Sequence, residues 1–295
     1  MKKAAAIIAI ICFSLILCSC QDLLNTVNDN VNKDQNTTNT PVLTLESENN
    51  INNKNEQDEK KNEKIKFDSI IAGDTITFGS YEQDNDVVFG KEPIEWIVLS
   101  VENDTALLLS KYAIDCVKYN KVGHNGPDWD NSYLRFWLNE EFLNDAFNKA
   151  EQEAIIESNL VTEGHPDDIE TTDKIFVLSK SDLCNPEYGF PEDENAYSDL
   201  RTANITDYAY YRIKTDDTVA DVYKGLYISE IKEDPEDRPC YYWVRETGKR
   251  NKKGRTAKVL SIDNVAVNYF GWITSSKTYD ECICVRPAMW INTGD

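Results

Sequence analysis

The residues of this chain that could carry chemistry are first of all its cysteines. Five of them follow residue 65: Cys116, Cys184, Cys240, Cys282 and Cys284. Cys282 and Cys284 are two positions apart, and on a strand side chains at that spacing share a face. An odd number leaves at least one thiol unpaired outside the cytoplasm, and spacing alone assigns no disulfide. The alternative for each cysteine is a small buried hydrophobic residue.

Catalysis by a serine or cysteine nucleophile needs a base within hydrogen-bond reach. Only His124 and His165 could supply an imidazole, and they lie in separate segments typical of loops. The sequence has no glycine-rich phosphate loop, no Gly-x-Ser-x-Gly elbow and no His-Glu-x-x-His motif. Carboxylates are so numerous that no acid pair stands out. The sequence therefore predicts no catalytic residues and no cofactor, and it favours a non-enzymatic role.

Three polar residues in one segment are candidates for a calcium site. Asp128, Asp130 and Asn131 offer the hard oxygen ligands that Ca²⁺ prefers. Their spacing is not that of an EF-hand loop. The alternative is that Asp130 or Asn131 caps the helix that follows.

Aromatic residues are the candidates for binding a sugar, because an exposed ring in a cleft can stack on a pyranose. Trp129, Trp243 and Trp272 are the residues that we would assign this role. Arg286 is a further candidate for ligand binding. Its alternative is a structural one, an ion pair or a clamp on loop carbonyls, because Arg286 lies in a predicted strand directly before Pro287.

The first twenty residues have the pattern of an export signal. Lys2 and Lys3 precede residues 4–17, a stretch with Ser14 as its one polar residue. This stretch is shorter than the roughly 20 apolar residues that span a bilayer, and it suits the hydrophobic region of a signal peptide. It ends in Leu17-Cys18-Ser19-Cys20, which matches a lipobox. We therefore predict a signal peptide at 1–19 and a lipid anchor on Cys20.

Composition divides the remainder into a tether and one domain. Residues 20–64 are rich in asparagine and charge and poor in aromatic residues, so they bury too little apolar surface to fold. Residues 65–295 contain all six tryptophans and suit a single domain. The net charge of −21 argues against nucleic acid as a partner. The expected location is the cell envelope outside the cytoplasm, with the membrane as a partner through the lipid.

Residue patterns within the domain predict an α+β fold: an antiparallel sheet, a cluster of short helices and long loops. Alternation predicts a first strand at 74–79 and a hairpin of strands at 94–101 and 105–111. Polar caps predict helices that begin after Ser132, near Glu140 and at Lys149, the last with a capping box of Asn148 and Glu151. Further strands are expected at 174–179, 241–245, 257–263 and 283–291, and loop with a short helix at 182–214.

The order of these segments resembles DUF6273, a bacterial domain family of unknown function. The matching pieces are 78–83 (FGSYEQ), 94–99 (IEWIVL), 106–110 (ALLLS), 129–139 (WDNSYLRFWLN), 142–147 (FLNDAF), 173–179 (DKIFVLS), 242–245 (YWVR) and 285–291 (VRPAMWI). The closing Val-Arg-Pro segment also looks like the end of sulfatase-modifying-factor and C-type-lectin-like domains, which implies a C-type-lectin-like fold. Neither resemblance carries a catalytic residue onto this chain.

These features favour a surface module that binds a glycan, a peptidoglycan fragment or a protein outside the cell. One alternative is an envelope enzyme, related to the sulfatase-modifying group or acting on sugars through carboxylates. The other is a purely structural surface protein.

Overall fold

The computed structural model of the 295-residue chain describes residues 67, 69–121, 128–163, 168–215, 238–247, 263–268, 271–277 and 283–294. The predicted signal peptide, Cys20 and the tether lie outside these residues, as do His124, His165 and Cys282. In the part of the chain that the structure describes, no helix is long and apolar enough to cross a membrane.

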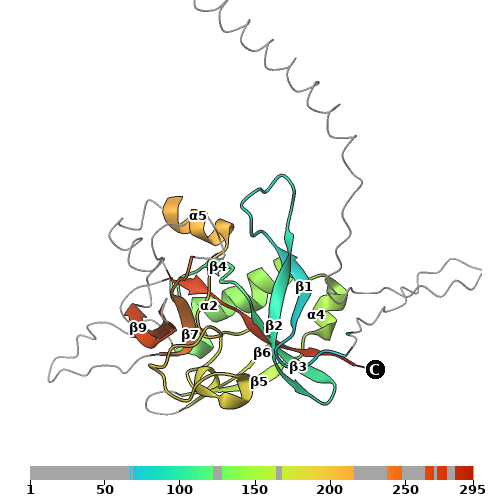
Figure 1. Cartoon of the computed structure of the whole chain (residues 1–295). Coiled ribbons are helices and arrows are strands. Elements are labelled where there is room, and N and C mark those ends of the chain that lie inside the picture. The colour runs from blue at the N-terminus through green and yellow to red at the C-terminus, as the bar shows by residue number, and fades with distance from the viewer. Residues whose placement is uncertain are drawn as a thin grey trace, which may run out of the picture. The chain divides into compact units, whose positions relative to one another are not determined.

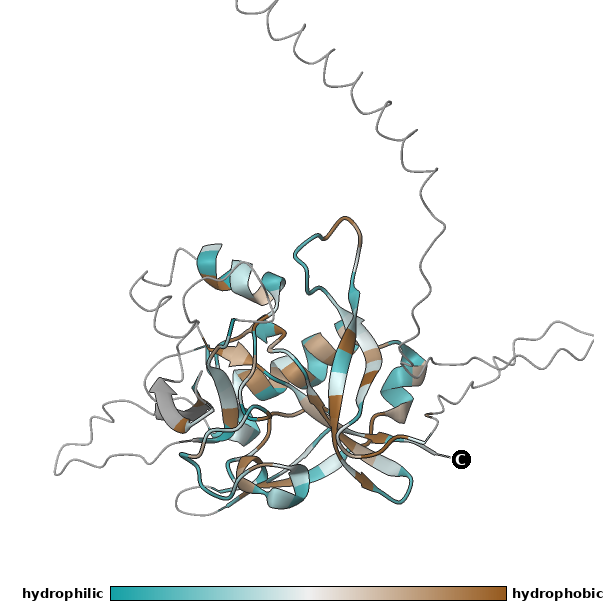
Figure 2. Ribbon diagram, in the orientation of Figure 1, coloured by the Kyte–Doolittle hydropathy of each residue, from teal (hydrophilic) through white to brown (hydrophobic). Residues whose placement is uncertain are grey.

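Four antiparallel strands form the first sheet (Figure 1). In spatial order they are β1 (Thr75–Tyr81), β2 (Glu92–Glu102), β3 (Thr105–Ser110) and β11 (Ala288–Asn292). Buried and exposed positions alternate along β2, and Figure 2 shows the matching bands of hydrophobic and hydrophilic residues. The hairpin predicted between β2 and β3 is confirmed.

Five strands form the second sheet: β4 (Asp115–Cys116), β10 (Cys284–Val285), β7 (Tyr242–Thr247), β8 (Asp263–Val267) and β9 (Ile273–Lys277). The pair of β10 and β7 is parallel and the others are antiparallel. The single strand predicted at 283–291 is wrong, because Arg286 and Pro287 separate it into β10 and β11, which belong to different sheets. Pro287 has no N–H to donate to a ladder, but its carbonyl accepts a hydrogen bond from the Ser110 N–H at 2.9 Å.

A separate hairpin of β5 (Ser158–Thr162) and β6 (Ile169–Asp173) was not predicted. The neighbouring segment 174–179 was predicted as a strand and is not one. Residues 175–178 are buried, and one bridge between Phe176 and Ala288 is the pairing that the segment makes. Its hydrophobic run thus reflects burial rather than membership of a sheet.

The helices are short, as predicted. A nearly continuous helical run comprises η1 (Trp129–Asn131), α2 (Tyr133–Phe136), the π-helical turn η2 (Trp137–Phe142) and α3 (Leu143–Ala146). Ser132 caps α2 by accepting a hydrogen bond from the Arg135 N–H. The capping box of Asn148 and Glu151 is present at α4 (Lys149–Ala154). The segment 182–214, predicted as loop with a short helix, contains η3 (Asp182–Cys184), η4 (Pro186–Tyr188) and all but the last residue of α5 (Asp207–Thr215).

The helical run packs on the first sheet through aromatic side chains. Phe142 meets Tyr81 of β1 at a ring separation of 5.2 Å, and Phe147 meets Phe78 at 5.4 Å and Trp96 at 6.3 Å. Such pairs contribute beyond their buried area because ring edges and faces carry opposite partial charge. Antiparallel sheets with short helices confirm the predicted α+β class.

Candidate functional site

Two of the three tryptophans proposed for sugar binding are fully buried. The Trp129 indole N–H donates to Asp173 Oδ2 at 3.0 Å, and the Trp243 indole N–H donates to the Val117 carbonyl at 2.7 Å. Tyr119 contacts both rings, at 6.2 and 5.6 Å between centroids. Because each ring is enclosed and each N–H is bonded inside the protein, neither offers a face to a sugar. Both indole rings are part of the hydrophobic core.

Trp272 and Arg286 have different surroundings. The Trp272 side chain is 43% exposed. Arg286 is buried, and its guanidinium donates to the carbonyls of Ser110, Leu200 and Thr202 at 2.8–3.1 Å. Arg286 is thus a clamp on loop carbonyls, the structural alternative, and a ligand cannot reach it in this conformation.

The predicted calcium ligands lie at η1. Asp130 Oδ2 accepts a hydrogen bond from the Asn131 side chain at 2.6 Å, and the Asp130 carbonyl accepts one from Arg135. Asp128 precedes η1 without a side-chain capping bond. Among the described residues, the acidic oxygens of Glu82, Asp84 and Glu92 lie within 4.8 Å of one another.

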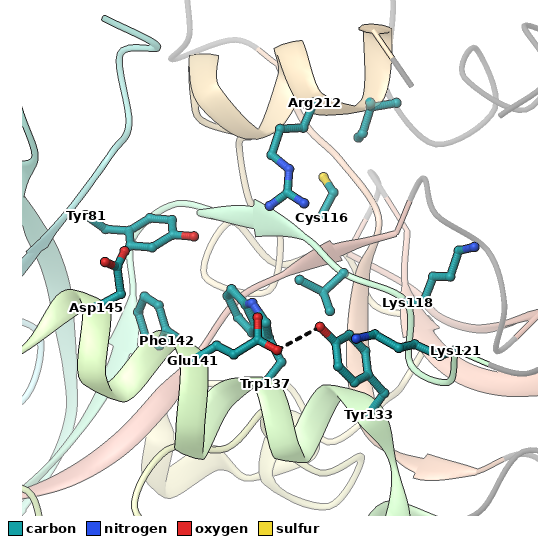
Figure 3. Close-up of a pocket in the computed structure, with 12 residues that line it drawn as sticks. Tyr81, Cys116, Lys118, Lys121, Tyr133, Trp137, Glu141, Phe142, Asp145 and Arg212 are labelled. Atoms are coloured by element: carbon teal, nitrogen blue, oxygen red, sulfur yellow. Dashed lines mark hydrogen bonds between the residues drawn. The ribbon is translucent and has the colours of Figure 1, made fainter. Parts of the chain in front are cut away.

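A pocket of about 510 Å³ lies between β1, the segment after β4, the helical run and α5 (Figure 3). Cations, acids and aromatic rings share its wall, in contrast to the dispersed residues proposed from the sequence. Its lining consists of Tyr81, Cys116, Val117, Lys118, Lys121, Tyr133, Trp137, Glu141, Phe142, Asp145, Arg212 and Ile213.

One face of the helical run supplies four of these residues, spaced by four: Tyr133, Trp137, Glu141 and Asp145. Asp145 comes twelve residues after Tyr133. In an unbroken α-helix, its side chain would therefore point about 120° away from that of Tyr133 around the helix axis. The π turn at Trp137–Phe142 takes up an additional residue, which offsets about 100° of that drift. The π turn therefore keeps all four side chains on the pocket.

Arg212 and Asp115 form the ion pair at the opposite wall. Arg212 Nη1 lies 2.5 and 2.6 Å from the two Asp115 carboxylate oxygens, and the Tyr81 hydroxyl donates to Asp115 Oδ2 at 2.7 Å. Burial raises the pKa of Asp115, an effect that Arg212 opposes. Burial and the nearby Asp115 raise the pKa of Tyr81, which stays a neutral donor. The Arg212 side chain is 45% exposed, so part of its guanidinium faces the pocket.

Lysines and acids complete the lining. The Lys121 ammonium lies 3.6 Å from the centre of the Tyr133 ring, and the Tyr133 hydroxyl donates to Glu141 Oε1 at 3.0 Å (Figure 3). Asp145 pairs with Lys91 at 2.6 Å. Both pocket acids therefore have partners. The arrangement suits recognition of a ligand with an anionic group and an apolar or sugar face.

A second hollow of about 590 Å³ includes Arg135 and Asp173. Asp173 is buried and accepts hydrogen bonds from Arg135, Trp129 and Thr171. The Asn139 side chain belongs to the same hydrogen-bond network: it donates to the Ile175 carbonyl and accepts from the Ile175 N–H. These contacts fix the helical run to β6, so the WDNSYLRFWLN segment is explained by architecture.

Sequence reasoning missed the pocket because its residues come from four separate segments. The repeat of four at Tyr133, Trp137 and Glu141 was available as a signal, since it mixes aromatic and acidic residues on one helical face. No pattern marked Lys118, Lys121 or Arg212.

Comparison with known proteins identifies a domain family in the greater part of the chain. The family described as Domain of unknown function (DUF6273) matches residues 103–293, which is more than half of the chain. The match begins at the turn between β2 and β3, and β1 and β2 precede it in the same sheet. No curated protein and no solved structure matches the chain. The chain belongs to the DUF6273 family.

Proposed function

We propose that this protein is a lipid-anchored, non-enzymatic envelope module whose pocket binds a carboxylate-bearing glycan, such as a peptidoglycan fragment. The observation that carries the proposal is the gathering of Lys118, Lys121 and Arg212 beside Tyr133 and Trp137. The chain has 52 acidic and 31 basic residues, so three cations in one pocket contrast with its overall charge.

The chemistry of the pocket favours this ligand class. Guanidinium and ammonium groups bind carboxylates through charge-assisted hydrogen bonds. Aromatic rings give a sugar an apolar surface, and a few polar groups then fix its orientation. Because the protein as a whole repels anions, a carboxylate would be held by the cations of the pocket at short range.

Binding of matched sugars tests the proposal. Calorimetry with carboxylated and neutral forms of one peptidoglycan disaccharide should show binding that is at least about tenfold tighter for the carboxylated form. Lys121→Ala should remove most of this preference. Lys111→Ala is the matched control, because Lys111 also lies over a tyrosine, Tyr112, but does not line the pocket. Equal affinities for both sugars would refute the proposal.

A carboxylate-based sugar hydrolase is the second candidate, because Glu141 and Asp145 line the same pocket. Their existing partners, Tyr133 and Lys91, favour binding over catalysis. Product analysis after incubation with glycan strands distinguishes the two. Release of sugar by the wild type but not by Glu141→Gln would replace the binding proposal with hydrolysis.

Location rests on the lipobox, which lies outside the described residues. Lipid on Cys20 would place the domain outside the cytoplasm on a long tether. Labelling with a palmitate analogue, followed by membrane fractionation, should show a lipid that Cys20→Ser removes and Cys18→Ser leaves in place. Equal labelling of both variants would contradict the assignment.

We also propose a C-type-lectin-like relationship for the fold. The Val285-Arg286-Pro287 segment supports it, as does the position of the first and last strands, β1 and β11, in one sheet. An experimental structure that superposes on no lectin-like domain would exclude it.

A further inference from the structure

Three buried cysteines meet beneath the pocket. Cys116 and Cys284 bring their sulfur atoms to 3.3 Å, and Cys240 is a further neighbour of Cys284. Cys240 and Cys284 are fully buried, and Cys116 is 9% exposed. Sequence spacing could not have paired them, because Cys116 and Cys284 are 168 residues apart.

The backbone at Cys116 and Cys284 is suited to a disulfide. The two residues are directly opposite each other in the antiparallel pair of β4 and β10. Residues opposed in this way have Cα atoms about 4.5–5.5 Å apart, within the range of about 4.4–6.8 Å that a disulfide spans. Their side chains already point toward each other, since the sulfur atoms are in contact. Bond formation would therefore need only a small movement of the two side chains.

We propose that Cys116 and Cys284 are joined by a disulfide that ties β4 to β10 when the protein folds in an oxidising compartment. The two thiols lose two protons and two electrons to form one S–S bond. The oxidant is a second disulfide, of a thiol oxidoreductase or a small molecule, which is reduced to two thiols. The exchange runs through a mixed disulfide that the second cysteine resolves.

The geometry also assigns an order to the two cysteines. Cys116 lines the pocket, beside Arg212, and so is the thiol that an oxidant can reach (Figure 3). Cys284 lies behind it and is the resolving thiol. Burial raises the pKa of both thiols, so exchange is fastest before the second sheet has closed around them.

Cys240 is the competitor, and its position argues against it. Cys240 Sγ donates to the Ala203 carbonyl at 3.4 Å. The parallel pairing of β10 with β7 places Tyr242, not Cys240, opposite Cys284. Cys240 is therefore expected to remain a thiol.

Mass mapping of the full chain, exported by its own signal, tests this assignment. Free thiols are alkylated in acid-quenched, denatured protein before reduction, and those released by reduction receive a second, isotopically distinct label. We expect Cys116 and Cys284 to carry the second label and a linked peptide to contain both. Cys240 should carry the first label. The proposal would be overturned if all five cysteines beyond residue 65 carried the first label. A disulfide between Cys284 and Cys240 or Cys282 would overturn it as well.

Variants give an independent readout. Reductant should lower the melting temperature of wild type and of Cys240→Ser by at least about 5 °C, because both would keep the bond. The double variant Cys116→Ser/Cys284→Ser should melt at the same temperature with and without reductant. A shift that persists in the double variant would contradict the assignment, and the labelling of wild type stands even where a variant fails to fold.

Discussion

Asp115 shows how strongly a single buried charge can depend on its partner. The Asp115 carboxylate is fully buried, and Arg212 is the cation that pairs with it. Arg212→Met should lower the free energy of unfolding by about 3 kcal/mol, because it leaves a buried charge unpaired. Urea denaturation measures the change. The double variant Arg212→Met/Asp115→Asn should recover part of the loss, and equal stability of the single and double variants would contradict this explanation.

Glu246 predicts a pH dependence of stability. Its carboxylate is buried and accepts the Lys180 N–H at 2.7 Å, and burial raises its pKa from 4.5 to about 7. The folded protein thus binds this proton more tightly than the unfolded chain. The stabilisation of the fold by this bound proton is complete below pH 4.5 and is lost as the pH rises through about 7.

Glu246→Gln should therefore gain stability over wild type as the pH rises, by about 3 kcal/mol between pH 4.5 and pH 8. Urea denaturation at intervals across this range measures the difference. The Gln oxygen can still accept the Lys180 N–H. Glu187→Gln, on an exposed side chain, is the control and should show no such trend. A constant difference between Glu246→Gln and wild type would disprove the assignment to Glu246.

Individual residue types predicted the site poorly, for a physical reason. Tryptophan combines a large apolar surface with one N–H, and a core that supplies an acceptor buries it fully, as at Trp129 and Trp243. The lysines and Arg212 of the pocket have ordinary neighbours in sequence. Their proximity depends on tertiary contacts that no local pattern encodes.

At the level of elements, the contact of β1 with the helical run depends on Gly79. Gly79 has a φ of +68°, and a Cβ built there would lie 2.9 Å from the Ala146 carbonyl and against the Phe147 ring. Gly79→Ala should therefore lower the free energy of unfolding by about 3 kcal/mol, through backbone strain and overpacking together.

Gly90→Ala is the matched control for Gly79→Ala. Gly90 has a φ of +97°, but nothing lies within 4 Å of the added Cβ. Gly90→Ala should lower the free energy of unfolding only through backbone strain, by about 1 kcal/mol. Thermal and urea denaturation of both variants separate the two effects. Equal losses would show that the helix does not restrict Gly79.

Elements with one exposed face could be predicted from sequence, and those without one could not. The alternation in β2 and the caps at Ser132 and Asn148 are local sequence patterns that predict these elements. In the segment 174–179, residues 175–179 are all buried, so the apolar run does not distinguish a strand from a packed loop. β4 and β10 are two residues long, too short to leave a pattern.

For the molecule as a whole, Arg286 connects distant parts of the described fold. Arg286→Met should lower the free energy of unfolding by about 3 kcal/mol, because the carbonyls of Ser110, Leu200 and Thr202 lose a shared, buried donor. The sugar affinity that we propose for the pocket, measured on folded protein, should not change. A stable variant with weakened binding would restore the ligand role first considered for Arg286.

The position of β10 and β11 has a consequence for biosynthesis. β10 lies inside the second sheet and β11 completes the first, yet both emerge from the ribosome after every other strand described. Neither sheet can be completed before β10 and β11 have been synthesised, and the pairing of residues so distant in sequence is slow. Both sheets of the described domain therefore stay open until these last two strands have left the ribosome.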